Sequence, residues 1–308
     1  MVVSMTTART GIKARRRRNS RQKNGWAYLF LAPQLVGLLL FTVVPTLATI
    51  ALSFTNFRLG GTSDWVGFEN YLSQLSDPVL LKAATNTVVF TLMYVPAVVV
   101  AALSVSLLFL RVRRGRAVYQ TAYFMPLVTS TAATSLVWAL VFQPDYGLAN
   151  KALEGIGLPA LRWYSSPDQA LPTLVLIVVW ATVGNSIILF TAGIQSVPSH
   201  INEAAALDGA TGLKRLVFIT LPLISPTLFF VITITVIGSL QFFVEPFIIT
   251  SGGPGNATTT VVLELYRQAF TYSAIGPAAA ISCLLFVAIL LLTLIQFRLS
   301  RWVSYDRD

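Results

Sequence analysis

Few residues in this sequence are of types that could carry acid–base, nucleophilic or metal chemistry. The chain of 308 residues has one histidine, His200, and one cysteine, Cys283. A serine nucleophile needs a base within hydrogen-bond reach, and a cysteine metal site or an intramolecular disulfide needs more than one cysteine. The phosphate-binding pattern G-x-x-x-x-G-K-[ST] is absent as well. The sequence therefore predicts no catalytic, cofactor or metal site, and no nucleotide hydrolysis by this chain alone.

The most elaborate polar segment is EAAALDGATGLKRLVFITLPLISP, from Glu203 to Pro226. Ser199 or Asn202 can cap a short helix whose first turns contain Glu203, where an acid lies favourably near the positive helix end. The three alanines that follow let another protein surface approach the helix backbone closely, and Gly209 then ends the helix. This pattern predicts a short helix shaped to sit in a groove of another protein.

Two prolines, Pro222 and Pro226, lie at the start of the long apolar run that follows this segment. Proline bends a helix and fixes the direction in which it leaves the bend. A force on the short helix is therefore expected to reach a bent membrane helix.

The rest of the chain has the composition of a membrane protein. Hydrophobic residues make up 55% and charged residues 11%, with a mean hydropathy of +0.71, whereas ordinary globular proteins are about one quarter charged. Six apolar runs each reach the roughly 20 residues that a helix needs to cross a bilayer. They span about 27–54, 86–110, 117–142, 171–194, 216–244 and 277–297. None has the polar face of an outer helix in a soluble protein, so we predict an all-α integral membrane protein with six transmembrane helices.

Basic residues set the expected orientation. The net charge of +10 is concentrated before the first run, and further Lys and Arg lie between runs two and three, before run five and after run six. Basic residues favour the cytoplasmic side and can also contact anionic lipid. The sequence contains no nucleic-acid-binding motif, so a nucleic-acid partner is not indicated. We expect both termini and the Glu203–Pro226 segment inside, with loops at about 55–85, 143–170 and 245–276 outside.

The membrane interior holds neutral polar groups and no ionisable side chain within the cores of the six runs. Ionisable residues in a bilayer are expensive and usually functional, so their absence argues against a gradient-driven secondary transporter or a channel with a charged ring. A membrane scaffold without a transport role is a further alternative. The neutral groups can be hydrogen-bond glue between helices or the lining of a path for an uncharged polar solute.

The polar segment resembles the EAA loop of the permease subunits of binding-protein-dependent ABC importers, E-A-A-x-x-D-G-A followed by I-T-L-P-L-x-x-P. In that family the loop forms a coupling helix that docks on the ATPase. The resemblance implies an ATPase-coupling role for Glu203, Ala204, Ala205, Asp208, Gly209, Ala210 and Pro222.

A second stretch, FIITSGGPGNATTTVVLELYRQAF, is similar to the T-x-G-G-P-x-x-A-T loop in the first permease of sugar importers, the relatives of the maltose and glycerol-phosphate permeases. Within it, Gly252, Gly253 and Pro254 form an external docking loop or a plain turn, since these residue types also build ordinary turns. The resemblance covers about 81–297, with the first helix as the extra leading helix of the subfamily.

The resemblance implies a type I ABC importer permease fold in a prokaryotic inner or plasma membrane. It implies four partners besides the lipid: a second homologous permease that completes a heterodimer, a cytoplasmic ATPase dimer, an extracytoplasmic solute-binding protein and a sugar. ATP and Mg are then held by the ATPases, and this chain binds no cofactor. The expected parts are a basic tail (1–25), a first helix with its external loop (26–80), the transmembrane domain (81–298) and a cytoplasmic tail (299–308).

The solute path is assigned by location within this family. Counted from the coupling segment and the external loop, Asn185, Thr235, Ser239 and Phe242 lie at the levels where the maltose relative lines its sugar site. Neutral polar groups and aromatic rings suit a carbohydrate, and some relatives move glycerol-3-phosphate.

The topology is testable by labelling. Single cysteines at Ser63, Ser165 and Asn256, in a Cys283→Ala background, are expected to react with an impermeant thiol reagent added to intact cells, because these loops carry few basic residues. The absence of labelling at these three positions, together with labelling near Thr211, would show that the orientation is the reverse of the predicted one.

Overall fold

The structure is a computed structural model that describes residues 30–58, 60, 61, 63–111 and 115–300. The expected basic tail (1–25) and nearly all of the C-terminal tail lie outside these described residues. The chain divides into two units, one ending at Leu52 and one beginning at Ser53, and each is described by itself.

The first unit contains one apolar helix, Phe30–Leu52, long enough to span a membrane. Its middle is a π-helical segment, η1 (Leu39–Val43), which continues into α2 (Val44–Leu52). Pro45 lacks the N–H group that a regular helical bond requires, and single π turns are one way for a helix to adjust to such a residue. The first of the six predicted spans is thus present as a helix.

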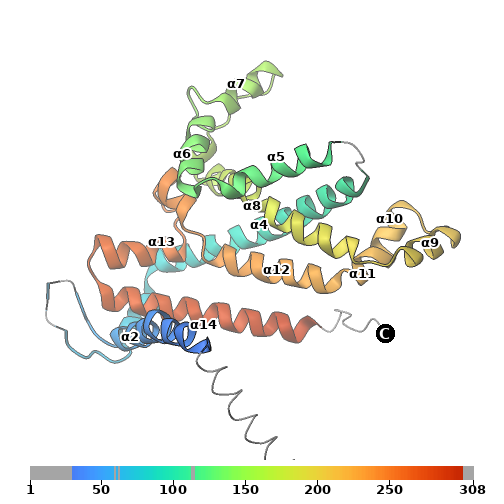
Figure 1. Cartoon of the computed structure of the whole chain (residues 1–308). Helices are drawn as coiled ribbons and strands as arrows, with labels where there is room; N and C mark the ends of the chain where they lie inside the picture. Colours follow the sequence, from blue (N-terminus) through green and yellow to red (C-terminus); the bar gives the residue numbers. More distant parts are fainter. Residues whose placement is uncertain (1–29, 59, 62, 112–114, 301–308) are drawn as a thin grey trace, which may run out of the picture. The chain divides into compact units, whose positions relative to one another are not determined.

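The second unit is built on three long helices and two bent helix pairs (Figure 1). The long helices are α4 (Pro78–Arg111), α8 (Pro167–Gln195) and α14 (Ile275–Leu299). In one bent pair, α5 (Arg116–Val128) is followed by α6 (Thr131–Val141); in the other, α10 (Gly212–Arg215), η3 (Leu216–Thr220) and α11 (Leu221–Leu223) lead into α12 (Ser225–Leu240). With each bent pair taken as one span, the described part of the chain has six.

The third predicted helix differs from the structure, because the run 117–142 is not one continuous helix. It bends by 102° between α5 and α6. Thr129 and Ser130 have extended backbones, with ψ of 143° and 126°, and Pro126 lies in the turn before them. Hydropathy alone cannot reveal this break. Thr and Ser are uncharged and only weakly polar, so the mean hydropathy of the run stays high across them.

The expected external loops contain helices of their own. These are α3 (Glu69–Ser76), α7 (Leu148–Gly155), η2 (Trp163–Ser165), η4 (Pro246–Thr250), α13 (Val261–Tyr266) and η5 (Arg267–Thr271). Side-chain amides fix the loop around α7, where Asn150 donates to the carbonyls of Pro144 and Leu161 at 2.8 and 2.9 Å. The loop between α6 and α8 is therefore held closed by the Asn150 side chain.

The core lies where α4 packs along α8, with α12 against both. Phe90 of α4 stacks on Phe242, with ring centroids 3.9 Å apart. Polar groups in this core have partners, as hydrocarbon surroundings require: the hydroxyls of Tyr94 and Thr182 are 2.8 Å apart. This pairing joins the two longest helices of the unit.

Small residues allow close helix contacts at two points of α8. A Cβ atom added at Gly184 would collide with the Tyr123 carbonyl oxygen of α5, and one added at Gly193 would lie 2.6 Å from Thr227 Oγ1 of α12. Membrane helices commonly pack through such residues because the backbones then approach closely. These contacts fix α8 against both bent pairs.

We predict that Gly184→Ala destabilises the protein by about 1–3 kcal/mol, as overpacking of a tight contact does. The matched control is Gly238→Ala in α12, where an added Cβ meets nothing within 4 Å and alanine improves helix propensity. Thermal unfolding of the purified complex measures both. Equal melting temperatures for the two variants would show that the α5–α8 contact is not close-packed.

Candidate functional site

The short helix predicted in the EAA segment is α9 (Ser199–Leu207). Its N-cap residue is Pro198, one residue before the earlier of the two expected caps, and no side chain caps the helix. Glu203 therefore lies in the second turn of α9, further from the positive helix end than a cap at Asn202 would place it. Proline is tolerated at the start of a helix because a backbone N–H at that position would have no helical partner.

The end of α9 agrees with the sequence. Gly209 and Gly212 have φ of +75° and +55°, in the left-handed region that glycine adopts without penalty. The Ala210 N–H closes the turn on the Ala205 carbonyl at 2.9 Å. Asp208 stands at the C-cap. The segment therefore reverses direction at the glycines and returns through α10.

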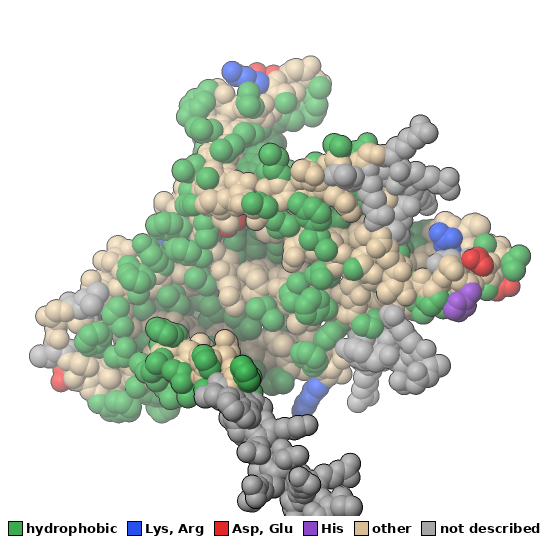
Figure 2. Space-filling model, in the orientation of Figure 1, with side chains coloured by type: hydrophobic (Ala, Val, Ile, Leu, Met, Phe, Trp, Pro, Cys, Tyr) green, Lys and Arg blue, Asp and Glu red, His purple; other side chains and the backbone are tan. Residues whose placement is uncertain are grey.

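Most side chains of this segment project outward. Ala205 is buried, whereas Glu203, Ala204, Asp208 and Gly209 are exposed. Larger apolar side chains are exposed with them: Leu207 at 90%, Leu213 at 73% and Phe218 at 76%. Figure 2 shows acidic, basic and histidine side chains gathered at this end, beside the apolar tip. Such a surface, apolar and ringed by charge, has the character of a protein-docking site.

The segment from α9 to α11, called the α9 docking segment below for the role that we propose for it, connects directly to the core. The chain bends by 76° between Gly212–Leu223 and Ser225–Leu240, with Pro222 in α11 and Pro226 at the start of α12. Ile224, at the bend, is fully buried in a cluster with Phe190 of α8. The bend predicted from the two prolines is present, and its apex is anchored in the helix core.

The four residues assigned to a solute path are not brought together on one surface. Asn185 is exposed on α8, whereas Thr235, Ser239 and Phe242 are buried. Ser239 Oγ lies 2.9 Å from Thr91 Oγ1 and 2.7 Å from the Val236 carbonyl. Ser239 thus has within this chain the partners that a role as helix glue requires.

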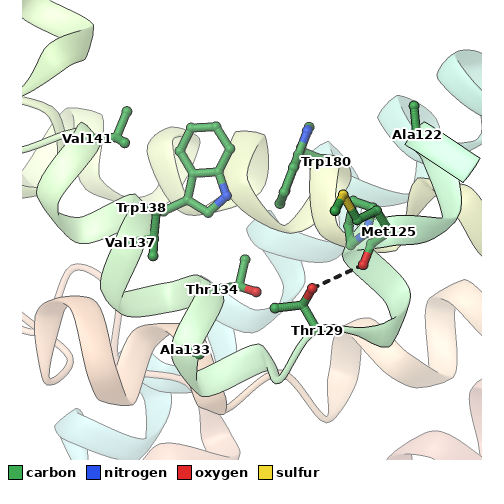
Figure 3. A pocket seen from close by; sticks show the side chains of 10 residues that line it. Ala122, Met125, Thr129, Ala133, Thr134, Val137, Trp138, Val141 and Trp180 are labelled. Carbon is green, nitrogen blue, oxygen red and sulfur yellow. Dashed lines mark hydrogen bonds between the residues drawn. The ribbon is translucent and has the colours of Figure 1, made fainter.

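A pocket of about 460 Å³ lies in the bend between α5 and α6, a feature that the sequence analysis did not identify. Figure 3 shows Trp138 and Trp180 side by side in its lining, with Thr129 and Thr134 nearby. The two indole rings meet edge to face, with centroids 5.1 Å apart. The lining is mostly apolar, with hydroxyls from the threonines. In the sequence, the one signal for this pocket was the presence of a tryptophan within each of two predicted spans.

The loop at Gly252–Pro254, which we expect on the outer side of the membrane, is an ordered structure. Thr258, Thr259 and Thr260, which follow it, are fully buried. Asn86 of α4 donates to the carbonyls of Asn256 and Thr259 at 2.7 and 2.9 Å. The loop is therefore fixed to the start of α4, which no sequence pattern indicated.

One buried acid lies at the edge of this region. Glu245 is the N-cap residue of η4, five residues after the end of α12, and is 7% exposed. Burial raises the pKa of its carboxyl, and a hydrogen bond from its own backbone N–H opposes that effect. Its place at the first position of an expected external loop gave no sign of this burial.

Known proteins with similar sequences are transport permeases. The probable ABC transporter permease protein YesP of Bacillus subtilis is 33% identical over 295 residues, which cover 94% of this chain and 95% of YesP. The arabinooligosaccharides permease AraP of the same organism is 32% identical over 90% of this chain and 89% of its own. The sn-glycerol-3-phosphate permease UgpA of Agrobacterium fabrum is 32% identical over 88% of this chain and 93% of its own.

A solved structure shows the same fold. A chain in the crystal structure of a bacterial alginate ABC transporter, in complex with an alginate pentasaccharide-bound periplasmic protein, superposes with a TM-score of 0.79 at 22% identity. The match covers 92% of this chain and 96% of that one. This chain thus has the fold of a chain of that ABC transporter. The permeases similar in sequence are non-catalytic transport components.

Residues 72–305 match the family described as binding-protein-dependent transport system inner membrane component. Since this match covers most of the chain and the similar permeases align over nearly their whole length, the chain belongs to that family of multi-pass inner membrane permeases.

Proposed function

We propose that this chain is one permease of an ATP-driven importer that moves a carbohydrate delivered by an extracytoplasmic binding protein. The observation that carries the proposal is the exposed α9 tip joined to a bent membrane helix whose apex is in the core. A docking surface at one end of a bent spanning helix is the arrangement needed to convert closure of an ATPase into movement of the helix. A second, homologous permease completes the path as a heterodimer.

The chemistry of energy supply belongs to the partners in this proposal. ATP and Mg are bound by two cytoplasmic ATPase subunits, and this chain holds no cofactor. Its own part is mechanical: Leu207 and Leu213 present apolar contacts, and Glu203 and Asp208 border them with charge. The rigid connection through Pro222 then carries the displacement to α12.

The solute class follows from side-chain chemistry and from the relatives. Arabinooligosaccharides and trehalose or maltose are the solutes in the names of two similar permeases, and the alginate transporter acts with a pentasaccharide-bound protein. The pocket between α5 and α6 is lined by no charged residue. Trp138 and Trp180 offer ring faces, and threonine hydroxyls offer hydrogen bonds. This combination favours a neutral sugar over glycerol-3-phosphate, whose phosphate needs a cationic partner.

The first prediction from this proposed function tests the contact between the α9 segment and the ATPase. Gly209→Val places a β-branched side chain at a φ of +75°, which L residues rarely adopt, in the middle of the docking surface. We expect at least a tenfold loss of both sugar uptake and co-purified ATPase. The matched control is Gly157→Val, because Gly157 has a φ of +77° and lies in the loop between α6 and α8.

Normal values for both measurements in Gly209→Val would exclude this surface as the ATPase contact. Deletion of residues 199–215 further separates the importer from the alternatives. A channel, a secondary transporter or a scaffold would keep its activity or its assembly without an ATPase, whereas the importer loses ATPase association.

The second prediction separates solute contact from helix packing. Asn185→Ala removes an exposed polar group and is expected to raise the half-saturating sugar concentration by up to about tenfold, the value of one hydrogen bond, with assembly unchanged. Ser239→Ala removes a buried hydroxyl beside Thr91 and is expected to lower thermal stability by roughly 0.6 kcal/mol. Uptake kinetics and unfolding measured on both variants test this. Altered stability and unaltered kinetics in Asn185→Ala would remove it from the path.

A further inference from the structure

Arg267, at the start of η5, contacts the external loop Ser251–Thr260 at three points. One guanidinium nitrogen donates to the Ser251 carbonyl at 2.6 Å. The other lies 3.5 Å from Asn256 Oδ1 and 3.4 Å from Thr259 Oγ1. The planar fork of arginine is suited to such multiple, directional contacts. One side chain therefore joins the beginning, the middle and the end of the loop.

A buried acid holds this arginine in place. Glu264 is 3% exposed, and its Oε2 lies 3.6 Å from Arg267 Nη1. Gln268 donates to the other carboxylate oxygen at 2.9 Å. Because a buried carboxylate is costly unless it is paired and hydrogen-bonded, this environment favours a single orientation of the arginine.

The backbone of the loop is fitted to the arginine. A Cβ atom added at Gly252 would lie 2.5 Å from both Arg267 Nη2 and Thr259 Oγ1, and Gly252 has a φ of +85°. Only glycine allows the guanidinium to approach this closely. Asn86 holds the carbonyls of Asn256 and Thr259, while Arg267 contacts the side chains of the same two residues, so the two together restrain the loop.

The loop also forms one wall of a recess. A cavity of about 420 Å³ is bounded by Gly255 and Ala257 of the loop, by Lys82 of α4 and by Asp168 of α8. Gly255 at the loop tip is exposed, and Pro254 and Asn256 are half-buried. The shape of the loop therefore sets the shape of a recess of mixed polar and apolar lining beside an exposed tip.

We propose that Arg267 is a positioning residue that pre-forms the loop Ser251–Thr260 as the docking surface for the soluble binding protein. This inference rests on the proposed function. It is supported by the place of the loop, which follows α12 at the end opposite the α9 docking segment (Figure 1). A loop ordered in advance binds more tightly because its conformational entropy is not lost on binding.

The test uses the assembled transporter with Arg267→Met, Arg267→Lys and Glu264→Gln. Hydrogen–deuterium exchange reports the order of residues 258–260, and ATPase activity is titrated with the purified binding protein of the same transporter. Arg267→Met is expected to speed exchange in the loop and to raise the half-saturating binding-protein concentration about tenfold, with the maximal ATPase rate unchanged. Arg267→Lys and Glu264→Gln are expected to show smaller shifts in the same direction, since each keeps part of the contact.

The matched control is Arg58→Met, because Arg58 is an exposed arginine of another external loop. It is expected to leave both measurements unchanged. Unaltered exchange in all three test variants would overturn the positioning role. Faster exchange with an unchanged binding-protein titration would overturn the docking role of the loop. If the binding protein does not change the ATPase rate of the unmodified transporter, that result contradicts the proposed function instead. Hydrogen–deuterium exchange then still decides whether Arg267 orders the loop.

Discussion

The structure depends on the requirement that polar groups in hydrocarbon find partners inside the protein. Regular helices satisfy their backbone groups, and the hydroxyls on them bond mostly to carbonyls one turn earlier. Thr87 donates to Ala83, Ser106 to Ala102 and Thr233 to Phe229, at 2.7 to 2.8 Å. These bonds let neutral polar side chains occupy the spans without unsatisfied groups. Several polar residues in the interior are thus explained without reference to a solute.

The same requirement limits where the helices can bend. Each bend lies beside a proline, where a backbone N–H is already missing, and carbonyls freed there need other partners. At the α11–α12 bend, the N–H of Ile224 still bonds to the Thr220 carbonyl at 3.0 Å, and that of Leu228 bonds to Ile224 at 2.9 Å. The bend therefore costs few hydrogen bonds. A sharp turn between the docking segment and α12 is compatible with a rigid connection for this reason.

Local patterns in the sequence predicted the features that depend on a few neighbouring residues. Uninterrupted hydropathy located the spans, glycine marked the end of α9, and Pro222 with Pro226 marked the bend. Of the two caps expected for α9, Ser199 lies one residue after the actual N-cap, Pro198, whereas Asn202 lies four residues after it. The break at Thr129 and the pocket beside it depend on how α5 and α6 pack on α8, which one sequence does not contain.

Contacts between distant residues were beyond the sequence for the same reason. The bonds from Asn86 to the external loop cross about 170 positions, and burial of Ser239 against Thr91 crosses 148. By contrast, the triplet Gly252, Gly253 and Pro254 was recognisable as a special turn. The pattern identified the loop, but not the residues that hold it.

The two ends of α12 are built differently, and the proposed partners account for the difference. The loop beyond its C-terminus has buried threonines and a buried acid paired with Arg267. The segment before its N-terminus exposes Leu207 and Leu213, which water disfavours. In the proposed complex, an ATPase that stays bound covers such apolar groups continuously, so the segment needs no internal core. The proposed binding protein arrives and leaves in each cycle, so its docking surface must keep its shape when it is uncovered. On this proposal the α9 segment is completed by its partner, while the Ser251–Thr260 loop is complete by itself.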